Sequence, residues 1–71
     1  MRDKAATREK ILLAAEEVFA DKGYHGTLVD EIAEASSTSK GAIYFHFPSK
    51  EEIFFALMDQ FAKRVMGDIE D

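Results

Sequence analysis

The sequence predicts an all-α fold in which three helices form a small head and a longer fourth helix extends from it. Glycine occurs at only four positions and proline only at Pro48, so turn signals divide the 71 residues into a few elements. Apolar residues recur at helical spacing both before and after that proline. No alternating run of apolar and polar residues is long enough for a strand.

The first helix is predicted over residues 8–22, directly after Thr7. Its apolar face follows the i, i+1, i+4, i+7, i+8 spacing of a helix: Ile11, Leu12, Ala15, Val18 and Phe19. Lys22 followed by Gly23 is typical of a helix end, because glycine adopts left-handed backbone angles at low cost. We expect residues 1–6 to form a flexible arm ahead of this helix.

The second helix is predicted to start at Thr27, with Asp30 three positions later completing a capping box. Its apolar side would consist of Val29, Ile32 and Ala33. The hydroxyl-rich run over residues 36–39 prefers turns to helix interiors, so this helix should be short.

Ser39 can cap a third helix over residues 40–45, and Pro48 ends it by disfavouring helical geometry at the residue before it. Ile43 and Phe47 are four apart and should both face the core. The side of this helix that faces away from the core would then carry Tyr44, Phe45 and His46. Two short helices joined by a serine-rich turn and packed on a longer helix are typical of a helix-turn-helix.

Ser49 and Glu52 form another capping-box pattern, which predicts the start of the fourth helix. Its apolar residues follow at spacings of three, four and one: Ile53, Phe54, Leu57, Phe61, Val65 and Ile69. A helix over residues 50–66 would be about 25 Å long, more than a head of this size can cover. Phe54 and Phe55 cannot both face one core. We expect one to pack into the head and the other either to contact a domain absent from these 71 residues or to be a surface aromatic of a truncated fragment.

The charges are distributed unevenly along the chain. The net charge is −5, yet residues 35–50 contain no acid and carry +2 through Lys40 and Lys50, which leaves −7 on the remainder. An acidic protein that keeps one surface free of carboxylates has the charge pattern of a polyanion-binding protein.

Several function classes find no support in the sequence. Without cysteine there is neither a disulfide framework nor a thiolate zinc site, and His25 has no second histidine at ligand spacing. Ser39 and His46 are seven apart with no acid between them, and Gly41 alone is no phosphate-cradling loop, so we predict no enzyme and no cofactor. No apolar run suits a membrane span or a signal peptide, so we expect a cytoplasmic protein.

The motifs resemble those of the TetR family of bacterial transcriptional regulators. The matching segments are Thr27 to Asp30, Ile32-Ala33, Ser39-Lys40-Gly41-Ala42-Ile43-Tyr44-Phe45-His46-Phe47 and Ser49-Lys50-Glu51-Glu52. The resemblance runs from about residue 7 to 57. It implies a helix-turn-helix, homeodomain-like DNA-binding head over 7–48. Residues 49–71 would link this head to a larger, all-helical domain for ligand binding and dimerisation.

One departure from the family pattern lies in the turn. The family commonly has Gly-Val where this chain has Ser37-Thr38. A left-handed backbone conformation costs a serine roughly 1–2 kcal/mol, so we expect the turn to be less stable than usual.

The resemblance also implies the contacts to DNA. Tyr44 and Lys50 would contact phosphates, Thr27 and His46 are weaker candidates, and Lys40 could bind either a guanine edge or a phosphate. The full set of predicted DNA-contacting residues is Thr27, Ser39, Lys40, Gly41, Ala42, Tyr44, Phe45, His46 and Lys50.

The predicted function is sequence-specific binding of double-stranded DNA by a ligand-responsive repressor. It would act as a homodimer on a palindromic operator, with a small-molecule effector bound by the absent domain. The alternative is a helical protein-interaction module that uses the aromatic residues of 44–47 together with Phe54 and Phe55.

Overall fold

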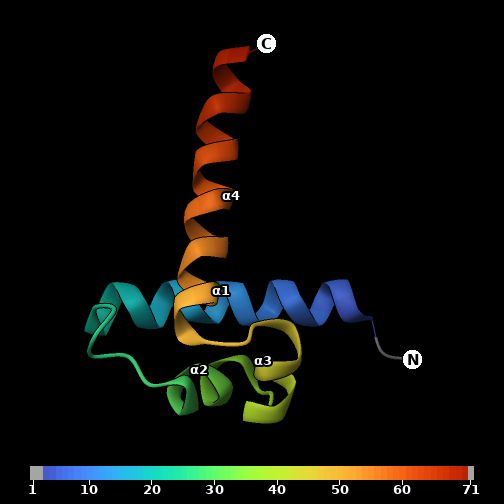
Figure 1. Cartoon of the computed structure of the whole chain (residues 1–71), viewed down its shortest axis with the longest axis vertical. Helices are drawn as coiled ribbons and strands as arrows, with labels where there is room; N and C mark the ends of the chain where they lie inside the picture. Colours follow the sequence, from blue (N-terminus) through green and yellow to red (C-terminus); the bar gives the residue numbers. More distant parts are fainter. Residues whose placement is uncertain (1–2, 71) are drawn as a thin grey trace.

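The computed structural model describes the backbone of residues 3–70 and the side chains of residues 3–67. It contains the helices α1 (Lys4–Lys22), α2 (Val29–Ser36), α3 (Lys40–His46) and α4 (Lys50–Glu70), and no strand among the described residues. The first helix lies across α2 and α3, and α4 rises away from this head (Figure 1). The predicted all-α fold, with three helices in a head and a long fourth helix, is confirmed.

The first helix starts earlier than the sequence predicted. The Asp3 carboxylate accepts hydrogen bonds from the amides of Ala5 and Ala6 at 3.0 and 3.2 Å. Aspartate is among the best N-caps because it satisfies amides that have no partner within the helix. The helix therefore begins at Lys4, and residues 4–6 of the expected flexible arm are helical. Residues 1 and 2 of that arm lie outside the described part of the chain.

The end of α1 is where the sequence placed it. Gly23 has a φ of +79°, and its amide donates to the Phe19 carbonyl at 2.7 Å. Lys22, the last residue of α1, forms an ion pair with Glu31 of α2. This contact raises the pKa of Lys22. The same contact, with the Leu28 amide as second donor, lowers the pKa of Glu31.

The second helix is capped one residue later than predicted. Its N-cap is Leu28, whose amide donates to the Glu31 carboxylate at 2.9 Å. Thr27 is fully buried, and its hydroxyl donates to the Gly23 carbonyl at 2.7 Å. The predicted capping box of Thr27 and Asp30 is therefore wrong. The threonine hydroxyl instead satisfies a carbonyl of the α1–α2 loop.

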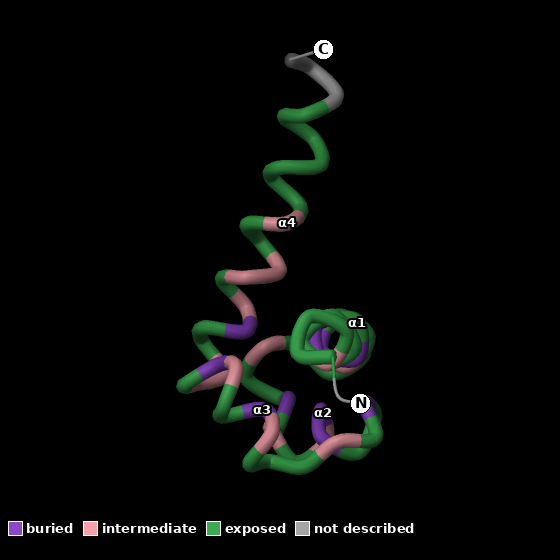
Figure 2. The backbone as a smooth tube through the Cα atoms, turned by 90° about the vertical axis from the view of Figure 1, so that its right-hand side faces the viewer, coloured by how far each residue is buried: buried purple, intermediate pink, exposed green. Residues whose placement is uncertain are grey.

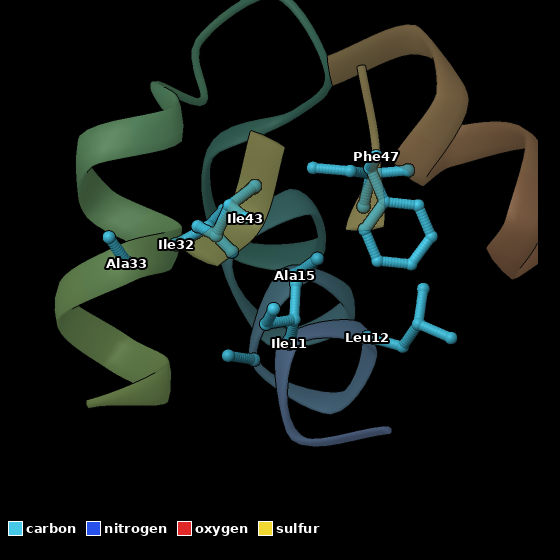
Figure 3. Close-up of a cluster of buried hydrophobic side chains, with 9 residues drawn as sticks. Ile11, Leu12, Ala15, Ile32, Ala33, Ile43 and Phe47 are labelled. Carbon is cyan, nitrogen blue, oxygen red and sulfur yellow. The ribbon is translucent and has the colours of Figure 1, made fainter. Parts of the chain in front are cut away.

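The core of the head is small and draws on all four helices. The buried residues lie where the three head helices meet the start of α4, and α4 is exposed beyond its first turns (Figure 2). Apolar side chains of α1 point at those of α2 and α3 (Figure 3). The buried apolar residues are Ile11, Leu12, Ala14, Ala15, Ile32, Ala33, Ile43, Phe47 and Ile53. This packing fixes the orientation of α3 relative to α1.

The turn between α2 and α3 has the left-handed backbone that the sequence suggested. Ser37 lies at φ +58° and ψ +39°, the one described non-glycine residue with a positive φ. Thr38 and Ser36 share a hydrogen bond of 2.7 Å between their hydroxyls. The Ser36 hydroxyl also donates its one hydrogen to the Ile32 carbonyl at 2.8 Å, so Thr38 must be the donor in the shared bond. The Thr38 hydroxyl, which stands where the family commonly has valine, therefore has a hydrogen-bond partner in Ser36.

Replacing Ser37 with glycine is expected to stabilise the head by about 0.5–1 kcal/mol. Relief of the left-handed strain on a serine, roughly 1–2 kcal/mol, exceeds the entropy that glycine adds to the unfolded chain. Urea unfolding of both proteins measures the difference. Ala35→Gly, two residues earlier and within α2, serves as the control and should lose up to about 1 kcal/mol. A Ser37→Gly protein that is less stable than the wild type would contradict the strain assigned to this turn.

Candidate nucleic-acid interface

The third helix is held by one face and exposes the other. The Ser39 hydroxyl accepts from the Ala42 amide at 3.1 Å and so caps its start. Ile43 and Phe47 are 0% and 3% exposed and pack into the core, as the sequence predicted. On the other side Tyr44 and Phe45 are 45% and 68% exposed. A helix anchored in this way can present its outer face rigidly to a large partner.

The leading end of α3 combines one lysine with small residues. Gly41 is exposed and Ala42 half-buried, so the backbone here can approach a partner closely. The Lys40 ammonium lies 3.4 Å from the carboxylate of Asp30 on α2. The segment without acids in the sequence therefore has an acid beside it in space. Both side chains are exposed, and such a pair is worth about 0–1 kcal/mol, so a phosphate can replace Asp30 at little cost.

Lys50 points back into the head at the start of α4. Its ammonium donates to the carbonyls of Tyr24 and Thr27 at 2.8 and 2.9 Å, and it lies 4.5 Å from the centroid of the Tyr24 ring. Two of its three N–H groups are thus used to tie α4 to the α1–α2 loop. A phosphate contact by Lys50 stays a prediction and would rely on the third N–H.

Comparison with known proteins agrees with this architecture. A family model described as "Bacterial regulatory proteins, tetR family" matches residues 11–57, about two thirds of the chain. The chain belongs to the TetR family. The resemblance inferred from the motifs of α2, α3 and the start of α4 is confirmed.

Named transcriptional regulators are similar to most of this chain. The HTH-type transcriptional activator FasR of Mycolicibacterium smegmatis is 39% identical over 62 residues, which cover 87% of this chain and 28% of FasR. The HTH-type transcriptional repressor BepR of Brucella suis is 46% identical over 56 residues, covering 79% and 27%. The HTH-type transcriptional regulator QacR of Staphylococcus aureus is 40% identical over 52 residues, covering 73% and 28%. The chain spans less than a third of the length of each of these three relatives.

Two of the residues predicted from the TetR motifs lie apart from the exposed face of α3. Thr27 is fully buried with its hydroxyl bonded to a carbonyl, so its side chain cannot contact DNA. This part of the prediction is wrong because the residue closes the loop after α1 instead of opening α2. Lys50 is directed at the same loop. The structure brings the other seven together on α3 and its cap: Ser39, Lys40, Gly41, Ala42, Tyr44, Phe45 and His46.

The first turns of α1 also border this surface, which the sequence motifs did not predict. Lys4, Thr7 and Lys10 border a hollow of about 670 Å³ whose other side is formed by the α2–α3 turn and α3. The Lys4 ammonium lies 5.2 Å from the centroid of the Phe45 ring. Four of the nine basic residues fall within the first ten positions, which was a signal for this surface. It was overlooked because residues 1–6 were expected to be a flexible arm.

The described residues contain neither a candidate metal cluster nor a candidate membrane span. No group of three or more histidine, aspartate or glutamate side chains in this part of the chain could hold a metal ion. Among the helices of the same region, none is long and apolar enough to cross a membrane.

Lys50→Met is expected to destabilise the head by about 1–2 kcal/mol. The change keeps the aliphatic stem of the side chain and removes two charge-assisted hydrogen bonds, leaving the Tyr24 and Thr27 carbonyls without that donor. Urea unfolding measures the loss, with Lys63→Met on the exposed part of α4 as a matched control that should change stability by less than about 0.5 kcal/mol. If Lys50→Met were as stable as the control, the lysine would not hold α4 in place.

Proposed function

We propose that this chain is the DNA-binding head of a transcriptional regulator and that α3 is its recognition helix. The observation that carries the proposal is the outer face of α3, where Lys40, Gly41 and Tyr44 face solvent on a helix anchored through Ile43 and Phe47. Membership of the TetR family supports this reading.

The dimensions and chemistry of that face suit the major groove of DNA. A helix with its side chains is about 10–12 Å across, and the groove is about 12 Å wide. The small side chains of Gly41 and Ala42 allow the start of α3 to approach base edges. Lys40 can donate to a guanine edge or a phosphate, and the Tyr44 hydroxyl can donate to a phosphate oxygen.

We further propose that the whole regulator acts as a homodimer on a palindromic operator. With a net charge of −5, one head should bind DNA weakly, because phosphate neutralisation supplies most of the affinity. Two heads placed about 34–36 Å apart would reach successive major grooves. A small molecule bound in a second domain would change that spacing through α4. Repression is the proposed outcome, supported by the name of BepR, although FasR is named an activator.

In the alternative of a protein-interaction module, two of the six aromatic side chains turn inward, and one of them, Phe47, is buried in the core. Phe54 packs in the head, with its ring centroid 5.8 Å from that of Phe19 and 5.3 Å from that of Tyr24. Phe55 remains 55% exposed. This division between the two phenylalanines is the one that the sequence predicted.

Selection of bound duplexes from a random pool tests the proposed function. The chain is incubated with the pool at low salt, bound DNA is amplified, and the affinity for the selected duplex is measured by fluorescence anisotropy between about 50 and 200 mM salt. We expect a preferred half-site and an affinity that falls steeply with salt, because phosphate contacts release counterions. A palindromic site selected by the full-length regulator would support the dimer. Enrichment of no sequence, with no salt-dependent binding, would contradict the proposal.

A further inference from the structure

A basic groove runs beside α3 along the first turns of α1. Lys4, Thr7 and Lys10 line it from α1, Gly41, Phe45 and His46 line it from α3, and the turn over residues 37–39 closes it. The N-terminal half of α1 lies over α3, as the ribbon view shows (Figure 1). The groove therefore lies directly beside the helix that the proposed function places in the major groove.

The lining of this groove contains no acid. That composition is unusual in a chain with 14 acidic and 9 basic residues. Two nearby carboxylates have partners elsewhere: Asp3 accepts from backbone amides at the start of α1, and Glu9 lies 3.4 Å from the Gln60 amide of α4. Among the lining residues, Lys4 and Lys10 carry the formal charge.

The lysines are fixed relative to α3 by the fold. Ile11 and Leu12, next to Lys10 in sequence, are buried in the same core as Ile43. At the outer edge the Lys4 ammonium lies over the Phe45 ring at 5.2 Å, a favourable cation–π distance. A ligand that contacts α3 therefore meets these ammonium groups in one set geometry.

We propose that the first turns of α1 form a second phosphate-binding element, in which Lys4 and Lys10 contact the DNA strand that flanks α3. This inference rests on the proposed function. A helix fills the width of the major groove, so whatever lies beside it faces the sugar–phosphate backbone. Thr7, between the two lysines, can add a hydroxyl donor to a phosphate oxygen. The contacts position the head and raise affinity without reading sequence.

The dependence of DNA affinity on salt tests this element. We would measure it for the 71-residue chain and for Lys4→Ala, Lys10→Ala and the double variant, each on the selected duplex and on a duplex of unrelated sequence. Each single change should reduce the slope of log affinity against log salt by about 0.9, and the double change by about 1.8. Lys4→Arg and Lys10→Arg keep the positive charge and should therefore show the same slope as the wild type. Lys63→Ala, exposed on α4 away from the head, is the charge-matched control and should leave the slope unchanged.

The outcomes separate this inference from the proposed function. If the wild type binds DNA and the double variant keeps its slope, the α1 element is refuted and the role of α3 stands. A change in the preferred sequence, with an unchanged slope, would also refute it, because the lysines would then read bases. If the wild type shows no salt-dependent DNA binding at all, both proposals fail. Circular dichroism of each variant confirms that these exposed substitutions leave the helices intact.

Discussion

Gly41→Glu is expected to weaken DNA binding by about 100-fold or more while leaving the head at least as stable as the wild type. Such a loss corresponds to about 2.7 kcal/mol. The new carboxylate would lie on the exposed leading end of α3, where the proposed function brings the helix against phosphates and base edges. The repulsion acts on the bound state alone, so affinity should fall without any loss of folded protein.

The stability part of this prediction follows from the position of Gly41 in α3. A side chain added there meets only the Ser39 hydroxyl, at an ordinary contact distance of 3.7 Å. Glycine within a helix costs roughly 0.8–1 kcal/mol relative to alanine, and an acid in the first turn of a helix is favourable to its dipole. Urea unfolding should therefore show an unchanged or higher midpoint for the variant.

Gly67→Glu is the matched control for the binding measurement. It makes the same chemical change on the exposed part of α4, where nothing lies within 4 Å of an added side chain. We expect its DNA affinity to remain within about threefold of the wild type at 0.1 M salt, because charges beyond the Debye length of about 10 Å are largely screened. Equal losses for the two variants would mean that net charge, and not the face of α3, controls binding.

Ile43→Ala is expected to destabilise the head by about 2–5 kcal/mol. Its side chain is 0% exposed at the centre of the contact between α3 and the rest of the core, and truncation leaves a cavity that a small domain fills poorly. A domain of 71 residues has little stability to spare, so a large fraction of the variant should be unfolded at 37 °C.

Thermal unfolding followed by circular dichroism measures this effect. Tyr44→Ala, the neighbouring change on the exposed face of α3, is the control and should cost less than about 1 kcal/mol. If Ile43→Ala melted at the same temperature as Tyr44→Ala, the two faces of α3 would not have the roles assigned to them here.

The parts of the fold that sequence predicted well depend on local patterns. The inward positions of Ile43 and Phe47 follow from helical periodicity, and the cap at Ser39 and the stop at Gly23 follow from the chemistry of single residues. Each of these features is determined within a few positions of the chain, so a local pattern was sufficient.

The features that sequence missed depend on contacts between distant segments. Thr27 matched a capping pattern, yet its hydroxyl closes a loop because the path of the chain brings it to the Gly23 carbonyl. Lys50 matched an anion-binding position, but its ammonium binds the carbonyl of Thr27, which lies 23 positions earlier in the chain. No local pattern contains either partner.

The surface charge also depends on contacts between distant segments. The stretch without acids in the sequence becomes a mixed surface in space, because Asp30 reaches Lys40 and Lys50 turns toward the α1–α2 loop. The basic groove beside α3 is instead completed by Lys4 and Lys10 from the far end of the head sequence. Net charge over a window of sequence therefore indicated the region of the candidate nucleic-acid interface but did not define the residues that form it.

The central claim is that α3 binds in the major groove, and base analogues in the selected duplex test it most directly. Replacing purines one at a time with 7-deazapurines removes an acceptor from the major groove alone, whereas replacing guanine with inosine removes a donor from the minor groove alone. We expect affinity to fall at a few adjacent 7-deazapurine positions within each half-site and to be unaffected by inosine at the same positions. Loss of affinity with inosine, and none with 7-deazapurines, would contradict the placement of α3.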